Sequence, residues 1–365
     1  MLKYTDFKML EDSLDEYVQQ DVERIAQDDS IPWTYFEEKS ILVTGATGLI
    51  GSLLIKALAC RNRLFNSKIT IKAFVRNEIK AKQIFCDILG RDFFEIVVND
   101  VCNPIITSHV DYIIHGASIT SSIEYVTKPT ETIWTALQGS RNVLEFAKNN
   151  KVCGIVYLSS LEYYGSPSIQ NVTENDLGYI NPTSVRSSYS ESKRMVECMN
   201  SAYASEYNVP VKTVRLAQTF GPGISKNDNR VFAQFTRNII NKENLILHTT
   251  GETTRNYCYT ADVVSGILIV LAKGNPGEAY NIANTRTTNS IADMAKFLCD
   301  NFGNGKSRFI FDIQKNETDY GYYPTTKISL VTNKISKLGW TAKTDLYEMF
   351  DRTIASLKLK NQSSR

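Results

Sequence analysis

Tyr189 and Lys193 lie four residues apart in the stretch YSESK. A helix expected over 187–206 would place both side chains on one face. A tyrosine with a pKa of about 10 is a poor base at neutral pH, but a neighbouring ammonium favours the phenolate and lowers that pKa. Ser160, at the end of an apolar run typical of a strand, is expected to hydrogen-bond the same substrate oxygen. The three residues predict proton exchange with a sugar hydroxyl while a nicotinamide exchanges the hydride.

A glycine-rich turn upstream predicts the cofactor site. The strand-like run Ser40–Thr44 continues directly into GATGLIG and then into a helical pattern. Glycines at intervals of three permit a tight turn, close approach to a pyrophosphate, and packing of the helix on the strand. The helix N-terminus would then face the phosphates. The predicted cofactor-binding residues of this turn are Gly45, Thr47, Gly48, Leu49, Ile50 and Gly51.

Residues at the ends of later strands bear on which dinucleotide binds. An acidic residue after the second strand would bind the ribose diol of NAD, but Arg76 stands there and could accommodate the 2′-phosphate of NADP. The cofactor is therefore predicted as NAD or NADP. Asp100 and Val101 are expected near the adenine, and Ala117 and Ser118 are small enough to let a dinucleotide pass.

The elements that position these residues alternate along the chain. Near-continuous Ile, Val and Leu strands separated by helices predict a parallel sheet covered on both faces. The expected strands are Ser40–Thr44, Ile69–Val75, Phe94–Val98, Tyr112–His115, Ile155–Ser159 and Val211–Leu216, and the expected helices are 49–60, 78–89, 130–149 and 187–206. The predicted fold is α/β, a Rossmann-type doubly wound sheet with a smaller C-terminal substrate-binding lobe.

Three regions are predicted along the chain. Residues 1–38 form an N-terminal arm whose apolar spacing over 8–27 is roughly helical, docked on the body or on a second subunit. Residues 39–220 form the dinucleotide-binding domain. Residues 221–365 form mainly the lobe, with a late strand at Tyr280–Ala283 and helices at 230–241, 262–273, 289–301 and 345–358.

Several motifs occur together in a set order: TGATGLIG, DYIIHGAS, YLSSLEYYG, YSESK, RLAQTFGPG and RNYCYTADVV. In this order the chain resembles the extended short-chain dehydrogenase/reductases, the nucleotide-sugar epimerase and dehydratase group. The resemblance implies a nucleotide-sugar substrate, a homodimer, and catalytic roles for Ser160, Tyr189 and Lys193. It also implies that Arg255 grips the nucleotide diphosphate, and that Gln218 stands where many members have Asn.

Glu162 is not needed for oxidation and reduction at a single carbon, so it suggests a further proton transfer or a role in holding the substrate. Members that resemble 4,6-dehydratases carry Asp-Glu at this point, whereas here the pair is Leu161-Glu162, which disfavours dehydration. The chain resembles UDP-glucuronate decarboxylases better, because they share this Glu and an Arg three residues before the Tyr, here Arg186. In that chemistry, oxidation at C4 of the sugar makes a β-keto acid, which loses CO₂.

Alternatives remain open at this stage. Epimerisation at C4 needs the same oxidation, Arg76 favours a net NADPH-dependent reductase, and a dinucleotide-binding module without activity would not need Ser160, Tyr189 and Lys193.

A net charge of +2 gives no argument for nucleic acid. No apolar run has the length of a membrane span, and the N-terminus is not typical of a secretion signal. Seven scattered Cys and three isolated His predict a reducing cytoplasm and no metal centre.

Overall fold

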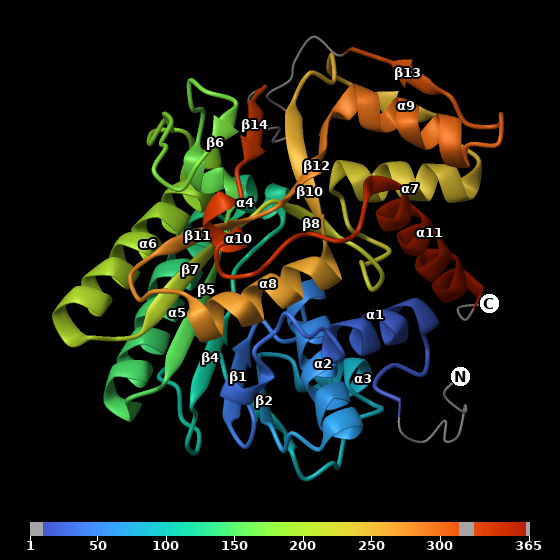
Figure 1. The fold of residues 1–365 in the computed structure, drawn as a ribbon. Coiled ribbons are helices and arrows are strands. Elements are labelled where there is room, and N and C mark those ends of the chain that lie inside the picture. Colours follow the sequence, from blue (N-terminus) through green and yellow to red (C-terminus); the bar gives the residue numbers. More distant parts are fainter. Residues whose placement is uncertain (1–9, 314–324, 363–365) are drawn as a thin grey trace.

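The computed structural model describes residues 10–313 and 325–362, and its centre is a seven-stranded sheet (Figure 1). The order of the strands is β11-β7-β5-β4-β1-β2-β3, and every neighbouring pair is parallel. The strands are β1 (Ser40–Thr44), β2 (Thr70–Val75), β3 (Phe94–Val98), β4 (Tyr112–His115), β5 (Gly154–Ser160), β7 (Val211–Leu216) and β11 (Ala279–Ile282). The prediction of a doubly wound parallel sheet is confirmed.

Helices cover both faces of this sheet because successive strand residues point to opposite sides. On β1, Ile41 and Val43 pack into one apolar core with α2 (Leu49–Phe65) and α8 (Thr260–Lys273). Leu42 packs into a second core on the other face. That face is covered by α5 (Pro129–Asn150) and α6 (Ser188–Tyr207), which lie side by side. The body therefore has three layers, and the carboxyl ends of the parallel strands all lie at one edge of its sheet.

Two short helices complete this body. α4 (Ser122–Thr127) precedes α5, and α3 (Glu78–Ile84) follows β2. α3 is shorter than the predicted helix over 78–89. The chain instead forms turns over 85–90 that bury Phe85 completely and end at Gly90, whose φ of +76° is a left-handed value.

A smaller lobe rises from the carboxyl edge of the sheet (Figure 1). Its sheet has the order β12-β10-β14-β6, with β8 beside β10, and β9 and β13 form a separate parallel pair. The strands are β6 (Asn171–Val172), β8 (Gln218–Phe220), β9 (Leu245–Leu247), β10 (Thr254–Tyr259), β12 (Asn284–Ser290), β13 (Phe309–Phe311) and β14 (Lys327–Leu330). The helices are α7 (Val231–Asn241), α9 (Ile291–Phe302), α10 (Asn333–Ser336) and α11 (Leu346–Gln362).

The segment 221–365 contributes to both sheets, because β11 and α8 return to the larger body before β12 enters the lobe. The helix predicted over 289–301 begins only at Ile291. β12 continues through Ser290, and the Ser290 hydroxyl then caps α9 by accepting a hydrogen bond of 3.0 Å from the amide of Asp293.

The N-terminal arm forms α1 (Glu16–Ala26), which packs on α2, α8 and α11 of the same chain. The predicted helix over 8–27 was too long. The helix begins only at Glu16, where Asp15 caps it by accepting bonds from the amides of Tyr17 and Val18. Residues 10–15 are irregular, and residues 8 and 9 lie outside the described part. Arg352 of α11 donates to Asp21 of α1 at 2.9 Å. Within residues 10–313 and 325–362, no helix is long and apolar enough to cross a membrane.

Candidate active site

The glycine turn packs so closely against the chain's own backbone that side chains would not fit at Gly45 or Gly51. Gly45 has a φ of +70°, and a Cβ there would lie 2.7 Å from the backbone of Gly116. A Cβ on Gly51 would lie 2.4 Å from the Gly45 carbonyl oxygen. Gly48 caps α2 without a side-chain hydrogen bond to the first turn. The helix therefore presents its N-terminal amides at the end of β1, which fits the pyrophosphate of a dinucleotide.

Buried polar contacts hold the ends of β1 and β4 together beneath this turn. The Thr44 hydroxyl lies 2.7 Å from Nδ1 of His115, whose Nε2 lies 3.0 Å from the hydroxyl of Ser140 on α5. The amide of Ala117 donates to Thr44 Oγ1 at 3.2 Å. Burial, reinforced by the Lys193 charge, lowers the pKa of His115 to about 3, so its ring is neutral. His115 thus positions the loop with Ala117 and Ser118, both half-buried.

The residues predicted near the adenosine end lie after β2 and β3. Arg76 is exposed, and its guanidinium lies 3.9 Å from the carboxylate of Asp100. Asp100 also accepts a 2.8 Å hydrogen bond from the amide of Cys102. Val101 is buried, and its methyl groups occupy the space beside Gly139 on α5. Arg76 and Asp100 thus place a cation beside a carboxylate at this edge, and Val101 packs against α5.

The predicted proton-transfer residues meet where β5 ends beside α6. The Ser160 hydroxyl, at the end of β5, accepts a 3.2 Å hydrogen bond from the amide of Glu162, and its proximity lowers the pKa of Tyr189 on α6. The ammonium of Lys193 lies 5.5 Å from the ring centre of Tyr189 and donates to the Leu158 carbonyl at 2.8 Å. The i, i+4 spacing therefore places Tyr189 and Lys193 on one face of α6, toward Ser160.

The electrostatics of this group differ from the sequence expectation. Burial, followed by the charge of Glu162, raises the pKa of Tyr189 to about 12, although hydrogen bonds from Ser160 and Tyr125 oppose the rise. Burial lowers the pKa of Lys193 to about 7, opposed by Glu197. The pKa of Tyr189 is thus raised, whereas the sequence predicted a lowering by the Lys193 ammonium, because burial is the largest cause for both side chains.

Glu162 lies in the same cluster and is fully engaged. Its two carboxylate oxygens accept bonds from Nη1 and Nη2 of Arg186, both at 3.0 Å. Ser190 of α6 donates to the same carboxylate at 3.1 Å. Only 10% of the Glu162 side chain and 14% of the Arg186 side chain are exposed. Leu161, by contrast, is buried in the apolar core and takes no part in this polar group.

Tyr125 of α4 belongs to the cluster, although sequence reasoning missed it. Its ring stacks on that of Tyr189 with centres 4.3 Å apart and an interplanar angle of 12°. The guanidinium of Arg186 lies 4.7 Å from the centre of the Tyr125 ring. A single tyrosine 64 positions before Tyr189 gives no signal in sequence, because α4 is brought to α6 only by the tertiary fold.

Gln218 and Arg255 lie on the smaller sheet, above the strand ends. Gln218 begins β8 and is paired with Tyr257 of β10, two residues after Arg255. Both side chains are half-buried. The two predicted substrate-binding residues therefore come from neighbouring strands of the lobe, whereas the Tyr189 cluster belongs to the larger body.

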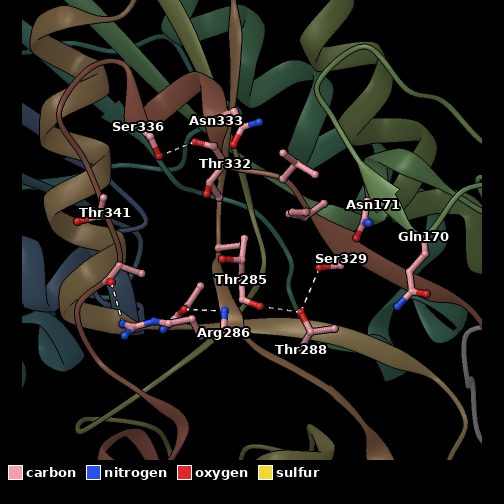
Figure 2. Close-up of a pocket in the computed structure, with 15 residues that line it drawn as sticks. Gln170, Asn171, Thr285, Arg286, Thr288, Ser329, Thr332, Asn333, Ser336 and Thr341 are labelled. Atoms are coloured by element: carbon pink, nitrogen blue, oxygen red, sulfur yellow. Dashed lines mark hydrogen bonds between the residues drawn. The ribbon is translucent and has the colours of Figure 1, made fainter.

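A separate hollow of about 740 Å³ lies between β6, β12, β14 and α10 (Figure 2). Its lining is mainly amide and hydroxyl side chains, among them Asn171, Thr288 and Ser329. Asn256 of β10 donates to Ser329 of this lining at 3.4 Å. The hollow is thus distinct from the Tyr189 cluster, and none of the predicted site residues lines it. The described residues contain no group of three or more His, Cys, Asp or Glu that could hold a metal ion.

Comparison with known proteins assigns the chain to a family of enzymes. The family model of the NAD-dependent epimerase/dehydratase family matches residues 41–283. The chain belongs to this family. Its members are NAD-dependent enzymes, and the glycine turn described above fits that cofactor.

Among relatives of this epimerase/dehydratase chain, UDP-glucuronic acid decarboxylase 1 of Xenopus tropicalis is 30% identical over 320 residues, 87% of this chain and 72% of that protein. UDP-glucuronic acid decarboxylase 6 of Arabidopsis thaliana is 30% identical over 79% of this chain and 85% of that protein. The fold resembles the epimerase Mth375 of Methanothermobacter thermautotrophicus, with a TM-score of 0.76, 21% identity, and 91% and 95% of the two chains covered.

Proposed function

We propose that this enzyme oxidises C4 of UDP-glucuronate and releases the sugar carboxylate as CO₂. The observation that carries the proposal is the cluster at the start of α6. There the side chains of Ser160 and Tyr189 come together and can hold a substrate hydroxyl, while Arg186 donates to Glu162 and lies over the ring of Tyr125, which stacks on Tyr189. The relatives named as UDP-glucuronic acid decarboxylases support it.

The residues proposed to bind NAD are those at the ends of β1 to β4. Gly45, Gly48 and Gly51 leave room for the pyrophosphate, with Thr47, Leu49 and Ile50 in the same turn, and Arg76, Asp100, Val101, Ala117 and Ser118 follow the later strand ends. Bound NAD supplies the acceptor, and later the donor, of the C4 hydride. Tyr189 and Lys193 are proposed to face the nicotinamide end.

Tyr189 is the proposed base for the C4 hydroxyl. The proton of the C4 hydroxyl passes to the Tyr189 oxygen, while Ser160 holds the oxygen of that hydroxyl by a hydrogen bond. The resting pKa of Tyr189, about 12, must fall before this transfer. The Lys193 ammonium, which lies 5.5 Å from the centre of the Tyr189 ring, is the proposed cause of that fall when NAD is bound.

The ketone formed at C4 is β to the C6 carboxylate. The bond between C5 and C6 can therefore break with its electron pair delocalised onto the C4 oxygen, and CO₂ leaves. A proton must then be delivered to C5. We propose that Glu162 and Arg186 act at this stage, with Arg186 holding the carboxylate before it leaves and Glu162 acting as an acid or base on the sugar. Arg255 and Gln218 are the proposed contacts to the nucleotide.

Epimerisation at C4 is the second candidate, because it begins with the same oxidation and needs no further carboxylate. The decisive experiment offers UDP-glucuronate labelled at C6 and measures labelled CO₂, with the nucleotide-sugar products identified by NMR. Decarboxylation predicts stoichiometric CO₂ and a pentose product. Conversion to UDP-galacturonate without CO₂ would establish the epimerase, and net consumption of added NADPH would establish a reductase.

We also propose a cytoplasmic homodimer that takes part in polysaccharide biosynthesis. The adjacent helices α5 and α6 expose large apolar side chains, with Trp134 60% and Met195 52% exposed, which suits an interface with a second copy. Light scattering after size exclusion tests the dimer, and Trp134→Glu should shift it toward monomer.

A further inference from the structure

A buried ion pair lies directly behind the catalytic cluster. Arg215 of β7 donates from Nη2 to the Glu197 carboxylate of α6 at 2.8 Å and from Nε at 3.1 Å. The two side chains are only 5% and 8% exposed. Charges so far from water are costly unless every donor and acceptor is satisfied, so the partners of this pair must be held firmly in place.

Those partners lie on both sides of the catalytic segment. The Ser159 hydroxyl, immediately before Ser160, donates to Glu197 Oε1 at 2.6 Å. On the far side, Arg215 Nη1 donates to the Tyr164 hydroxyl at 2.9 Å. Ser160 and Glu162 lie between these two anchors, on the end of β5 and on the short 3₁₀ turn η3 (Leu161–Tyr164). One ion pair therefore fixes the segment that presents both side chains.

The same carboxylate acts on Lys193, one helical turn earlier on α6. Burial lowers the pKa of Lys193, and the negative charge of Glu197 opposes that change. The other titratable groups beside Lys193 are His115 of β4, Tyr157 of β5 and Tyr189 of α6. Burial keeps His115 neutral and raises the pKa of both tyrosines, so these three groups are uncharged at neutral pH.

We propose that Glu197 is a positioning residue of this active site. Together with Arg215 it holds the segment that carries Ser160 and Glu162, and its charge stabilises the ammonium of Lys193. The inference rests on the proposed roles of Ser160, Tyr189 and Lys193 in hydride and proton transfer.

The first test measures the charge of Lys193 directly. Protein labelled with ¹³C at the ε-carbon of lysine is titrated by NMR, and the Lys193 signal is assigned from its loss in Lys193→Met. The wild-type midpoint is expected near pH 7. Glu197→Gln should lower it, on the order of one unit, because the change removes the negative charge one helical turn away that opposes the effect of burial. The matched control is Glu191→Gln on the same helix, whose side chain is 40% exposed and should leave the midpoint unchanged.

The second test follows reduction of NAD in a single turnover with UDP-glucuronate across pH. In Glu197→Gln the loss of rate at alkaline pH should begin about one unit lower than in wild type, and the rate at pH 8 should fall by about tenfold. Glu197→Asp keeps the charge but shortens the reach to Ser159, so it should lower the rate without moving the alkaline limb. Thermal unfolding confirms that each variant is folded.

Two outcomes separate the inference from the proposed function. A Lys193 midpoint and a rate that are both unchanged in folded Glu197→Gln would overturn the positioning role. A wild-type enzyme that never reduces NAD with UDP-glucuronate would instead overturn the proposed function, and the NMR titration would still decide whether Glu197 acts on Lys193.

Discussion

Replacing Glu162 by Gln tests how much of the site rests on its bond to Arg186. The pair has two parallel hydrogen bonds of 3.0 Å and is nearly inaccessible to water. Breaking a buried ion pair costs about 3–5 kcal/mol, because the remaining charge loses its partner. The Gln amide keeps one oxygen that can accept from Arg186, so the expected loss in unfolding free energy is about 2–4 kcal/mol.

Urea unfolding measures this loss, and a second variant shows whether it comes from the pair. Glu162→Gln combined with Arg186→Gln should cost less than the sum of the two single changes, since the second removes the charge that the first leaves unpaired. The matched control is Glu78→Gln, which breaks the exposed pair with Lys82 and should cost less than about 0.5 kcal/mol. A loss below about 1 kcal/mol for Glu162→Gln, or strict additivity in the double variant, would refute the reasoning.

Four further changes have defined outcomes. Tyr189→Phe should lower the rate of NAD reduction by about 10²–10⁴-fold, with an unchanged circular dichroism spectrum, because it removes the proposed base. Gly51→Ala places a Cβ 2.4 Å from the Gly45 carbonyl oxygen, so NAD affinity should fall at least about tenfold and stability by about 1–3 kcal/mol, as read by calorimetry. Arg76→Ala should weaken NADP binding more than NAD binding, since the exposed guanidinium can meet a 2′-phosphate; equal changes in the two dissociation constants would show that Arg76 is merely solvated. Burial raises the pKa of Asp21 from 3.8 to about 6. Between these two pH values the folded protein holds a proton that the unfolded chain has lost. Relative to Asp21→Asn, wild type should therefore lose about 3 kcal/mol of unfolding free energy as pH rises from 3.5 to 7.

The larger sheet could be predicted from sequence because its strands are short apolar runs between helices. β1, β3, β4 and β7 begin and end where expected, since each coincides with its own run of strand-forming residues. The strands of the lobe were largely missed. β6 has only two residues, and β12 reads NTRTTNS, with no apolar alternation that would distinguish it from a loop. Their pairing is decided by neighbours far along the chain.

The site could be predicted only where its residues lie close together in the sequence. Tyr189 and Lys193 are local on one helix, so their spacing carries the information. The stacking of Tyr125 on Tyr189 and the link from Glu197 to Ser159 join separate elements, and no spacing reveals them. The effect of burial on Tyr189 was also hidden, because desolvation depends on how completely α4 and α6 close over the ring.

The docking of α1 has a consequence for the order in which the chain folds. Asp21 accepts from the Tyr259 hydroxyl at 2.6 Å and from Arg352, which is 331 residues away. During synthesis, α1 can form early, but its carboxylate has no cationic partner from α11 until residues 346–362 have left the ribosome. Closing so long a loop is slow, since its entropy is lost before the contact is gained. Completion of the α1–α11 contact should therefore be a late step in folding, after α1 has packed on α2.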